Sequence, residues 1–420
     1  METSRGLGKR ADDWDPAASD PLLEQARMRR ECPVGWTSRL GSGAWAVTRY
    51  EDVVAAARDT VTFSNRNEPR LGPVPSPPIE VDRPEHTVYR RLLAPYFDQR
   101  RIAAMETVVR ELCAHLLQPV LDDGAAAPVD VAERFTYPFP ARVLCELLRI
   151  PPSDYTRLKR WSDEVFNADV LRDNDPARKA AANEQLRGYG RRLVSERRAM
   201  RLDPAEDLVT GLVSGEVDGQ PLDPERIVAL VRLLLSAGHN STTSSLGIVF
   251  LHLARDPQAQ RMLRERPALI PAAVMEFLRH ESPVMATPRT VARDAEFGGR
   301  RLRAGEQVFL VWSSANRDDG HYAEPERCRF DRDPDDTMVF GRGIHFCLGR
   351  PLALLELRVA TEELLARSGW IEVAGDVERT SWERYGVSRL PLRVTPAVAG
   401  PSSGLSSGPS SAGDDHGAWR

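Results

Sequence analysis

The feature that most constrains the fold of this 420-residue chain is a glycine-rich loop around one cysteine, placed directly before an amphipathic segment. The loop reads FGRGIHFCLG over residues 340–349, and apolar residues recur at helical spacing from Leu348 to Ala366. Gly341 and Gly343 allow sharp turns and the close approach of a flat ligand, because they carry no Cβ. Cys347 stands just before the expected helix, whose N-terminal N–H groups and dipole stabilise a thiolate. A thiolate in this position can ligate iron.

Taken alone, Cys347 has a plainer interpretation as one more small, buried hydrophobic residue, which is the commoner role of an intracellular cysteine. The rest of the loop argues against it. Gly349 keeps space beside the sulfur, and His345 and Arg342 can donate hydrogen bonds to anionic groups at the rim of a ligand. The five cysteines of the chain are scattered without a CxxC pair, so neither a disulfide framework nor a multi-cysteine metal site is indicated.

The composition excludes several classes of protein. With 41% hydrophobic residues, 28% charged residues and a net charge of −4, the chain has an ordinary core and no basic excess for nucleic acid. The N-terminus lacks the apolar core of a signal peptide, and no later stretch approaches the ~20 apolar residues of a membrane span. We therefore expect a cytoplasmic, monomeric protein that binds neither nucleic acid nor a membrane.

Helical periodicity dominates the chain, and its strongest segments are residues 106–121, 141–150, 226–238 and 348–366. Strand patterns are fewer and shorter; they lie near Ala44, over residues 289–312 and near the C-terminal end. We expect a mainly helical fold with small peripheral sheets. A single domain is expected over residues 1–399, with a disordered lead over about residues 1–20 and a disordered, low-complexity tail over residues 400–420.

Residues 226–254 form one long, very apolar helical pattern, which must be buried on nearly all sides and therefore cross the middle of the molecule. Its centre reads AGHNSTTSS from Ala237 to Ser245, which is small and polar for that position. Two interpretations stay open from these residues: something large packs against the helix there, or the helix is locally kinked.

The loop around Cys347 matches the haem-binding signature FGxGxHxCxG of the cytochrome P450 family at every fixed position. Further stretches resemble elements of this family in the expected order: the proline-led helix start over residues 82–91, the ExxR element over residues 276–279, Arg289, and the ANRD stretch over residues 315–318. The resemblance extends from about Asp82 to Pro396 and covers most of the chain.

The resemblance implies the cytochrome P450 fold, with haem b (iron protoporphyrin IX) between the long central helix and the helix after the cysteine loop. Cys347 is then the axial thiolate ligand of the iron. The residues implied in haem binding are His86, Arg90, Ala237, Arg289, Phe340, His345, Cys347 and Gly349. His86 and Arg90, four residues apart on one helix face, are assigned to one haem propionate and Arg289 to the other. Glu276 and Arg279 are assigned to a buried structural network.

The chain departs from the family on the central helix. Relatives usually place an acid followed by an alcohol there to relay protons to oxygen, and the same register gives Asn240 and Ser241 here. An amide can hold a water but cannot release and recover a proton near neutral pH. The relay can be rebuilt with His239, Thr242 and ordered water; the substrate can supply the hydroxyl; or oxygen activation is altered in favour of peroxide. We expect a conserved reaction type with an altered relay that involves Asn240, Ser241 and Thr242.

The activity implied is that of a monooxygenase that uses O2 and electrons from NAD(P)H, delivered by a separate ferredoxin or flavodoxin and its reductase. It hydroxylates, demethylates or couples a largely hydrophobic small molecule, as in secondary metabolism. The alternative is a peroxide-using or O2-independent haem-thiolate enzyme, or a haem protein that only binds ligands.

Two further sets of residues follow from the resemblance. Substrate-facing segments are expected over residues 64–80, on the central helix, over residues 284–288 and around residues 385–387. In the last two segments, the apolar residues Val284, Met285, Ala286 and Val387 indicate a largely hydrophobic substrate. Arginines available to an acidic redox partner, or simply solvated at the surface, are Arg100, Arg101, Arg342 and Arg350.

Overall fold

A computed structural model describes residues 12–66, 75–166, 175–217, 219–380 and 384–397. The expected tail over residues 400–420, the first part of the expected lead, and part of the proline-rich loop in residues 64–80 lie outside the described residues.

The α-helices of the described chain are α1 (Pro21–Glu31), α2 (Tyr50–Arg58), α3 (Glu85–Leu93), α4 (Gln99–Ala104), α5 (Glu106–Ala126), α6 (Pro138–Leu147), α7 (Tyr155–Phe166), α8 (Pro176–Met200), α9 (Leu208–Val213), α10 (Pro224–Arg255), α11 (Pro257–Glu265), α12 (Ile270–His280), α13 (Trp312–Ala315) and α14 (Arg350–Arg367). Short helical turns are η1 (Ala94–Phe97), η2 (Ala132–Thr136), η3 (Pro152–Asp154), η4 (Pro267–Leu269) and η5 (Gly343–His345).

The strands are β1 (Val34–Thr37), β2 (Ala44–Val47), β3 (Phe63–Ser64), β4 (Val129–Asp130), β5 (Glu216–Val217), β6 (Gln220–Pro221), β7 (Ala286–Val291), β8 (Ala295–Phe297), β9 (Arg300–Leu302), β10 (Gln307–Val311), β11 (Ser368–Val373), β12 (Glu378–Arg379), β13 (Val387–Arg389) and β14 (Pro391–Pro396). The prediction of a mainly helical protein with small sheets is confirmed.

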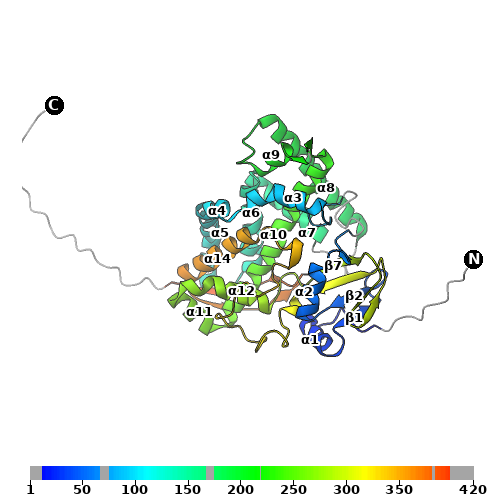
Figure 1. Ribbon diagram of the computed structural model, residues 1–420. Helices are drawn as coiled ribbons and strands as arrows, with labels where there is room; N and C mark the ends of the chain where they lie inside the picture. Colours follow the sequence, from blue (N-terminus) through cyan, green and yellow to red (C-terminus); the bar gives the residue numbers. More distant parts are fainter. Residues whose placement is uncertain (1–11, 67–74, 167–174, 218, 381–383, 398–420) are drawn as a thin grey trace, which may run out of the picture.

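The long helix α10 passes through the middle of the molecule, as the sequence predicts (Figure 1). It begins after Asp223, whose side chain accepts a hydrogen bond from the backbone N–H of Arg226, and proline fills the first helical position. Helices α6, α7, α8, α12 and α14 all pack against it. A helix surrounded in this way can place side chains at the centre of the fold.

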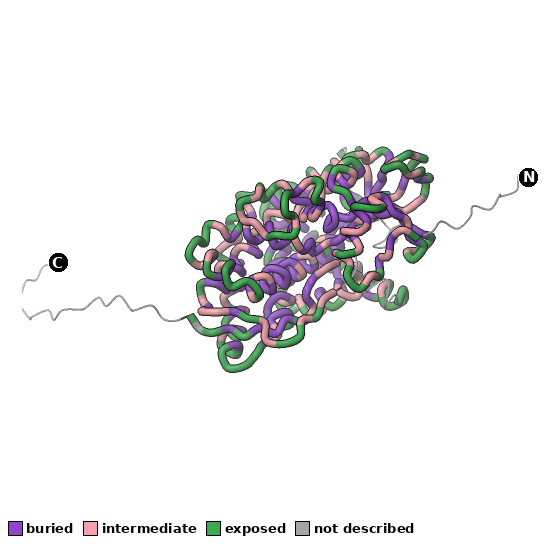
Figure 2. Tube along the Cα trace, turned by 90° about the horizontal axis from the view of Figure 1, so that it is seen from below, coloured by how far each residue is buried: buried purple, intermediate pink, exposed green. Residues whose placement is uncertain are grey.

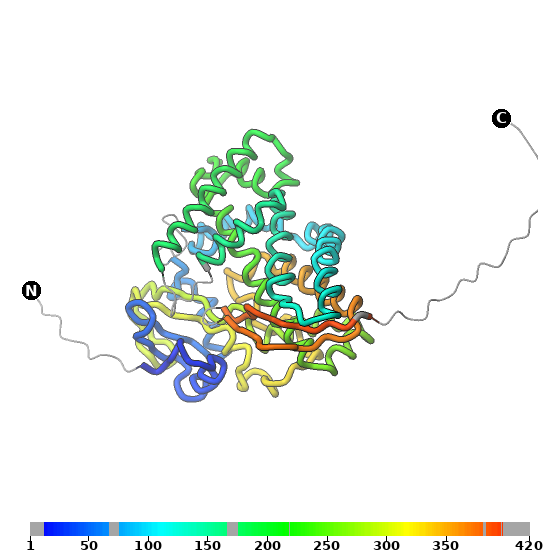
Figure 3. The backbone as a smooth tube through the Cα atoms, turned by 180° about the vertical axis from the view of Figure 1, so that it is seen from behind, coloured from blue at the N-terminus to red at the C-terminus, as the bar shows by residue number. Residues whose placement is uncertain are grey.

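The sheets lie at the periphery of the helices. The largest has the strand order β1-β2-β10-β7-β3, with β10 parallel to β2 and the other pairs antiparallel. It lies beside α1 and α2 (Figure 1). A second sheet, β11-β14-β4, covers the other side of the helical body, where Figure 3 shows its two long strands in orange and red. The patterns near Ala44 and over residues 289–312 are therefore strands, as expected.

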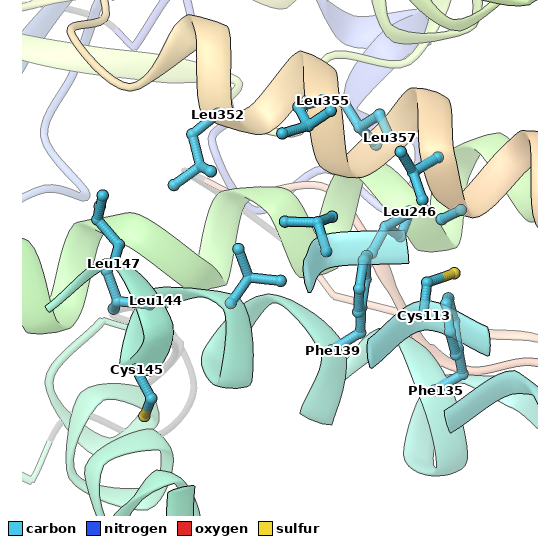
Figure 4. Close-up of a cluster of buried hydrophobic side chains, with 14 of the residues drawn as sticks. Cys113, Phe135, Phe139, Leu144, Cys145, Leu147, Leu246, Leu352, Leu355 and Leu357 are labelled. Atoms are coloured by element: carbon cyan, nitrogen blue, oxygen red, sulfur yellow. The ribbon is translucent and has the colours of Figure 1, made fainter. Parts of the chain in front are cut away.

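The main hydrophobic core lies between α5, α6, α10 and α14. In Figure 4, Leu352, Leu355 and Leu357 on α14 face Leu246 on α10 and Phe139 on α6. Figure 2 shows the same division on the scale of the whole chain, with buried segments inside and exposed ones at the rim. This core fixes α14, and hence the loop that precedes it, against the central helix.

The described part of the expected N-terminal lead is held against the large sheet. The backbone N–H groups of Asp13 and Trp14 both donate to the carbonyl of Trp36, at 2.8 and 3.0 Å. The Trp14 side chain is buried, with its ring centroid 5.9 Å from that of Phe309. Residues 12–20 are thus part of the folded body.

Within the described residues, no helix combines the length and the apolar character that crossing a membrane requires.

Candidate active site

The cysteine loop is shaped by hydrogen bonds within itself and by two glycines. The backbone N–H of Cys347 donates to the carbonyl of Phe340 at 2.9 Å, which closes the loop. Gly341 and Gly343 have φ values of +73° and +76°, a region that glycine adopts without strain, as the sequence predicts. Gly343 was also expected to let a flat ligand approach, and the structure gives it a different neighbour. A Cβ there would lie 2.3 Å from the carbonyl oxygen of Ala57, so this glycine admits the backbone of α2.

The sulfur of Cys347 lies at the N-terminal end of α14. Burial raises the pKa of its thiol, whereas hydrogen bonds from the backbone N–H groups of Gly349 and Arg350 and the charge of Arg90 lower it. Without a bound cation, Cys347 is therefore favoured in its thiol form. Two backbone N–H groups are already directed at its sulfur. A bound metal cation would deprotonate such a thiol outright. A Cβ at Gly349 would meet the Cys347 sulfur at 4.0 Å and no other described atom within that distance, so space remains beside the sulfur.

Four basic side chains surround the loop on one side: His86 and Arg90 on α3, Arg289 on β7, and His345 in the loop. The rings of His86 and His345 are 4.5 Å apart, and the Nε2 atom of each is buried without a hydrogen-bond partner among the described residues. Neither Arg90 nor Arg289 forms an ion pair with a carboxylate in the described chain. Burial, reinforced by neighbouring cations, lowers the pKa of His86 to about 4 and that of His345 to about 2.

This group of basic side chains fits the haem that the resemblance implies. Buried donors with no anion beside them are costly unless an anionic group satisfies them. Two propionates would supply the carboxylates, and iron would supply the cation that the Cys347 sulfur lacks. Arg342, by contrast, does not join the group. Its guanidinium donates to the carbonyl of Asp335 at 2.9 Å and to Tyr50, which corrects its expected place at the rim of the ligand.

One stripe of the central helix stays accessible although the rest of its middle is buried. The residues of this stripe, which we call the open stripe, are Leu234, Ala237, Gly238, Ser241 and Ser244. Their spacing of three and four residues puts them on one face. Gly238 and Ser244 border packed neighbours, Leu144 and Gly386, whereas Ala237 and Ser241 stay accessible. Ala237 and Ser241, two of the expected site residues, therefore share one side of α10.

The small residues at the centre of α10 have a packing reason as well. A Cβ on Gly238 would lie 2.9 Å from Cδ1 of Leu144, so the glycine admits helix α6. The helix remains α-helical from Pro224 to Arg255. Of the two interpretations left open by the sequence, close packing of a neighbour therefore accounts for Gly238.

Asn240 points away from the open stripe, toward helix α7. Its Nδ2 donates to Oγ of Ser162 at 3.0 Å, and Ser162 in turn donates to the carbonyl of Ser236 at 3.2 Å. Its Oδ1 is buried without a partner among the described residues. Ser162 lies 78 positions from Asn240 along the chain, and no motif or spacing near either residue identified it as a partner.

His239 and Thr242 lie on buried flanks of the same helix. Burial, together with the charges of Lys159 and Arg384, lowers the pKa of His239 to about 3. A contact with the backbone of Leu235 opposes this shift without cancelling it. His239 is therefore a neutral imidazole at neutral pH and cannot act there as a cationic acid.

Glu276 and Arg279 form the buried structural network that the ExxR resemblance implies. Arg279 donates to both carboxylate oxygens of Glu276 at 2.8 Å, and to the carbonyls of Asn316 and Pro325 at 2.7 and 2.9 Å. Glu276 also accepts from Nε of Arg332 at 3.0 Å. The carbonyl acceptors lie in and after the ANRD stretch, so the network ties α12 to the segment that leads into the cysteine loop.

Three of the four apolar residues expected to face substrate are core residues. Met285, Ala286 and Val387 are all buried. Ala286 packs in the cluster that contains Trp14, and Val387 packs against α10 at Gly247, where a Cβ would lie 3.1 Å from it. Hydrophobicity alone does not distinguish a core side chain from one that lines a pocket. Val284 is half-buried and remains available.

The comparisons with known proteins agree with this geometry. The sequence profile described as Cytochrome P450 matches residues 158–266 and 268–394. Vitamin D(3) 25-hydroxylase from Pseudonocardia autotrophica is 36% identical over 90% of this chain and 95% of the relative. Erythromycin C-12 hydroxylase from Saccharopolyspora erythraea is 36% identical over 89% of this chain and 93% of the relative.

The fold agrees as well. The structure of a mutant of P450 EryK in complex with erythromycin B superposes with a TM-score of 0.81 at 33% identity, over 91% of this chain and 97% of that one. The part of the chain that the family profile matches includes both the central helix and the cysteine loop. The chain belongs to the cytochrome P450 family and is a P450 monooxygenase.

Proposed function

We propose that this monooxygenase holds haem b through the Cys347 thiolate and oxidises a largely hydrophobic small molecule. The observation that carries the proposal is the Cys347 sulfur at the start of α14, with two backbone N–H groups directed at it and unpaired basic side chains beside it. When bound, the haem supplies activation of O2 and insertion of one oxygen atom, which thiolate ligation favours.

The chain's own residues divide the binding of the haem among them. His86 and Arg90 hold one propionate, because they lie one turn apart on α3. Arg289 and His345 hold the other. Phe340 acts through its carbonyl, which fixes the N–H of Cys347, and Gly349 acts through the space it leaves beside the sulfur. Ala237 lies on the open stripe, where the absence of a larger side chain leaves room for the flat ring.

The proton relay divides between two sides of α10. Ser241 carries its hydroxyl on the open stripe and is the group that donates a hydrogen bond within the site. Asn240 is a positioning residue: its amide, held by Ser162, fixes the polar contact between α10 and α7. Thr242, on a buried flank, supports the same segment. With an amide in place of an acid, the Ser241 hydroxyl must regain its proton from water.

The substrate is proposed to be a largely hydrophobic small molecule of secondary metabolism. The names of two relatives specify vitamin D(3) and erythromycin as the compounds that those proteins hydroxylate. Leu234 and Ala237 on the open stripe and half-buried Val284 are the apolar surfaces that this chain offers.

Electrons are proposed to come from NAD(P)H through a separate ferredoxin or flavodoxin and its reductase. Arg100, on the short helix α4, is exposed and suits an acidic partner. Arg101 donates to the carbonyls of Ala205 and Glu206. Arg342 and Arg350 both donate to Asp335. These three arginines are therefore already bonded within the chain. A cytoplasmic, monomeric state stays a prediction.

The proposal is tested by reconstituting the haem-loaded protein with a ferredoxin, its reductase and NAD(P)H, and screening hydrophobic compounds for shifts of the Soret band. Compounds that shift the band are then assayed for an oxygenated product. We expect O2-dependent product that requires the redox partners. Product formed equally well with hydrogen peroxide alone, and none with NAD(P)H, would instead establish the peroxide-using alternative that Asn240 motivates.

A further inference from the structure

A second group of side chains, all of types that can ligate a metal ion, lies at the C-terminal end of α10, away from the open stripe. His252 stands in the last turn of α10, His280 ends α12, and Glu281 follows it. One ring nitrogen of each histidine and one carboxylate oxygen lie within 4.8 Å of one another. Nε2 of His252 is 3.1 Å from Oε1 of Glu281. Three ligands contributed by the ends of two helices are thus already close together.

One histidine presents a nitrogen atom that nothing in the described chain satisfies. Nδ1 of His280 is buried without a hydrogen-bond partner, whereas Nε2 of His252 faces Oε1 of Glu281. The other nitrogen of His280, Nε2, lies 3.1 Å from the carbonyl oxygen of Glu326. A carbonyl only accepts, so Nε2 carries the hydrogen and Nδ1 is left with a free lone pair. Metal-ligating histidines are typically fixed by this kind of bond to a carbonyl.

The surroundings orient the remaining ligands. Arg379 donates to Oε2 of Glu281 and leaves Oε1 on the side of His252. The ring of Phe277 stacks on that of His252 at 4.8 Å between centroids and holds its plane. Both α10 and α12 end here, and the negative ends of their dipoles favour a cation. The charges of Arg379 and nearby Arg317 oppose it, so we expect a site weaker than a buried zinc centre.

We infer that His252, His280 and Glu281 form a binding site for a zinc-class divalent transition metal ion. Two imidazoles and one carboxylate suit Zn²⁺, whereas Mg²⁺ and Ca²⁺ prefer oxygen ligands throughout. Three protein ligands leave a fourth position for water. A metal bound there would link the C-terminal ends of α10 and α12, and α12 carries the Glu276–Arg279 network.

The test is a zinc titration of the haem-loaded protein after treatment with a chelator and desalting, followed by calorimetry with Zn²⁺ alone. We expect the wild type to bind one more equivalent of zinc than either His252→Gln or His280→Gln. Loss of a hydrogen-bonded neighbour of a ligand already costs about 10–100-fold in metal affinity, so loss of a ligand should cost at least as much. His115→Gln, at an exposed histidine on α5, is the matched control and should bind like the wild type.

Two further measurements keep the result decisive. Arg379→Gln removes the competing cation and should tighten zinc binding, and zinc should raise the Tm of the wild type but not of His252→Gln. Each variant is first checked for an unchanged spectrum of its reduced carbon monoxide complex. Equal zinc stoichiometry and affinity in the wild type and both histidine variants would overturn the site and leave a simple ion pair between Glu281 and its neighbours.

Discussion

Removing the carboxylate of Glu276 should destabilise the protein because it leaves Arg279 as a buried, unpaired cation. Both side chains are buried, and Arg279 donates to both carboxylate oxygens at 2.8 Å. The change Glu276→Ala also removes the acceptor of the Arg329 backbone N–H, at 2.9 Å, and of Arg332. Loss of one partner of a buried pair costs about 3–5 kcal/mol in the free energy of unfolding.

That cost translates into a measurable shift. At about 2.1 cal/mol/K of unfolding entropy per residue, a chain of this length should lose about 3–6 °C in Tm, provided that it unfolds cooperatively. The measurement is scanning calorimetry of the haem-loaded protein. Asp331→Ala is the control, because Asp331 pairs with Arg329 at the exposed edge of the same network and exposed pairs contribute little.

A second variant separates the buried charge from the lost hydrogen bonds. In Glu276→Met combined with Arg279→Met, the buried cation at position 279 is removed and only the more accessible Arg332 loses its carboxylate, so part of the lost Tm should return. Two results would refute the unpaired cation as the cause of the loss. One is an equal Tm for Glu276→Ala and the Asp331→Ala control. The other is a Tm of the double variant that lies below that of Glu276→Ala by the full cost of the second substitution.

Three further predictions concern the site. Asn240→Asp should raise the product formed per NAD(P)H consumed, since it restores an acid on the buried flank of α10, next to Ser241 in the sequence, and Ser241→Ala should lower it by about tenfold or more. Unchanged coupling in both would exclude them from proton delivery. Arg289→Met should weaken haem retention by about 10–100-fold, because a hydrogen bond to a charged group contributes about 1.5–3 kcal/mol. The control is Arg293→Met, at an exposed residue just after β7, which should retain haem normally. In the folded protein the pKa of His239 is about 3, below its ordinary value of 6.5. As the pH is lowered, the unfolded chain therefore binds a proton at this histidine before the folded chain does. Stability should fall as the pH drops from about 6.5 toward 3. His239→Gln should make denaturant midpoints less dependent on pH over this window, and an identical dependence would contradict the assignment.

The features that could be predicted from the sequence are those encoded in short stretches. The cysteine loop lies within ten consecutive positions, and the positive φ angles of Gly341 and Gly343 follow from residue type. The long helix followed from the apolar pattern over residues 226–254, and the structure extends it to Pro224–Arg255. The ExxR pair followed from a spacing of one helical turn, and a downstream arginine was expected to join it. That this arginine is Arg332, 56 positions from Glu276, is shown only by the fold.

What escaped prediction depends on contacts between distant segments. Nothing near Asn240 indicates that Ser162 receives its amide hydrogen, because only the packing of α7 on α10 brings them together. Met285 and Val387 are as apolar as any substrate contact, and only the fold shows that they are in the core. Gly343 was assigned to ligand approach for a sound steric reason, but the backbone that approaches it is that of Ala57.

The central claim, that Cys347 ligates the haem iron, is tested most directly by the absorption spectrum of the reduced carbon monoxide complex. We expect the red-shifted Soret band of thiolate ligation in the wild type, and its replacement in Cys347→His by the unshifted band of an imidazole-ligated haem. A thiolate-type band that persists in Cys347→His would contradict the assignment of this cysteine as the ligand.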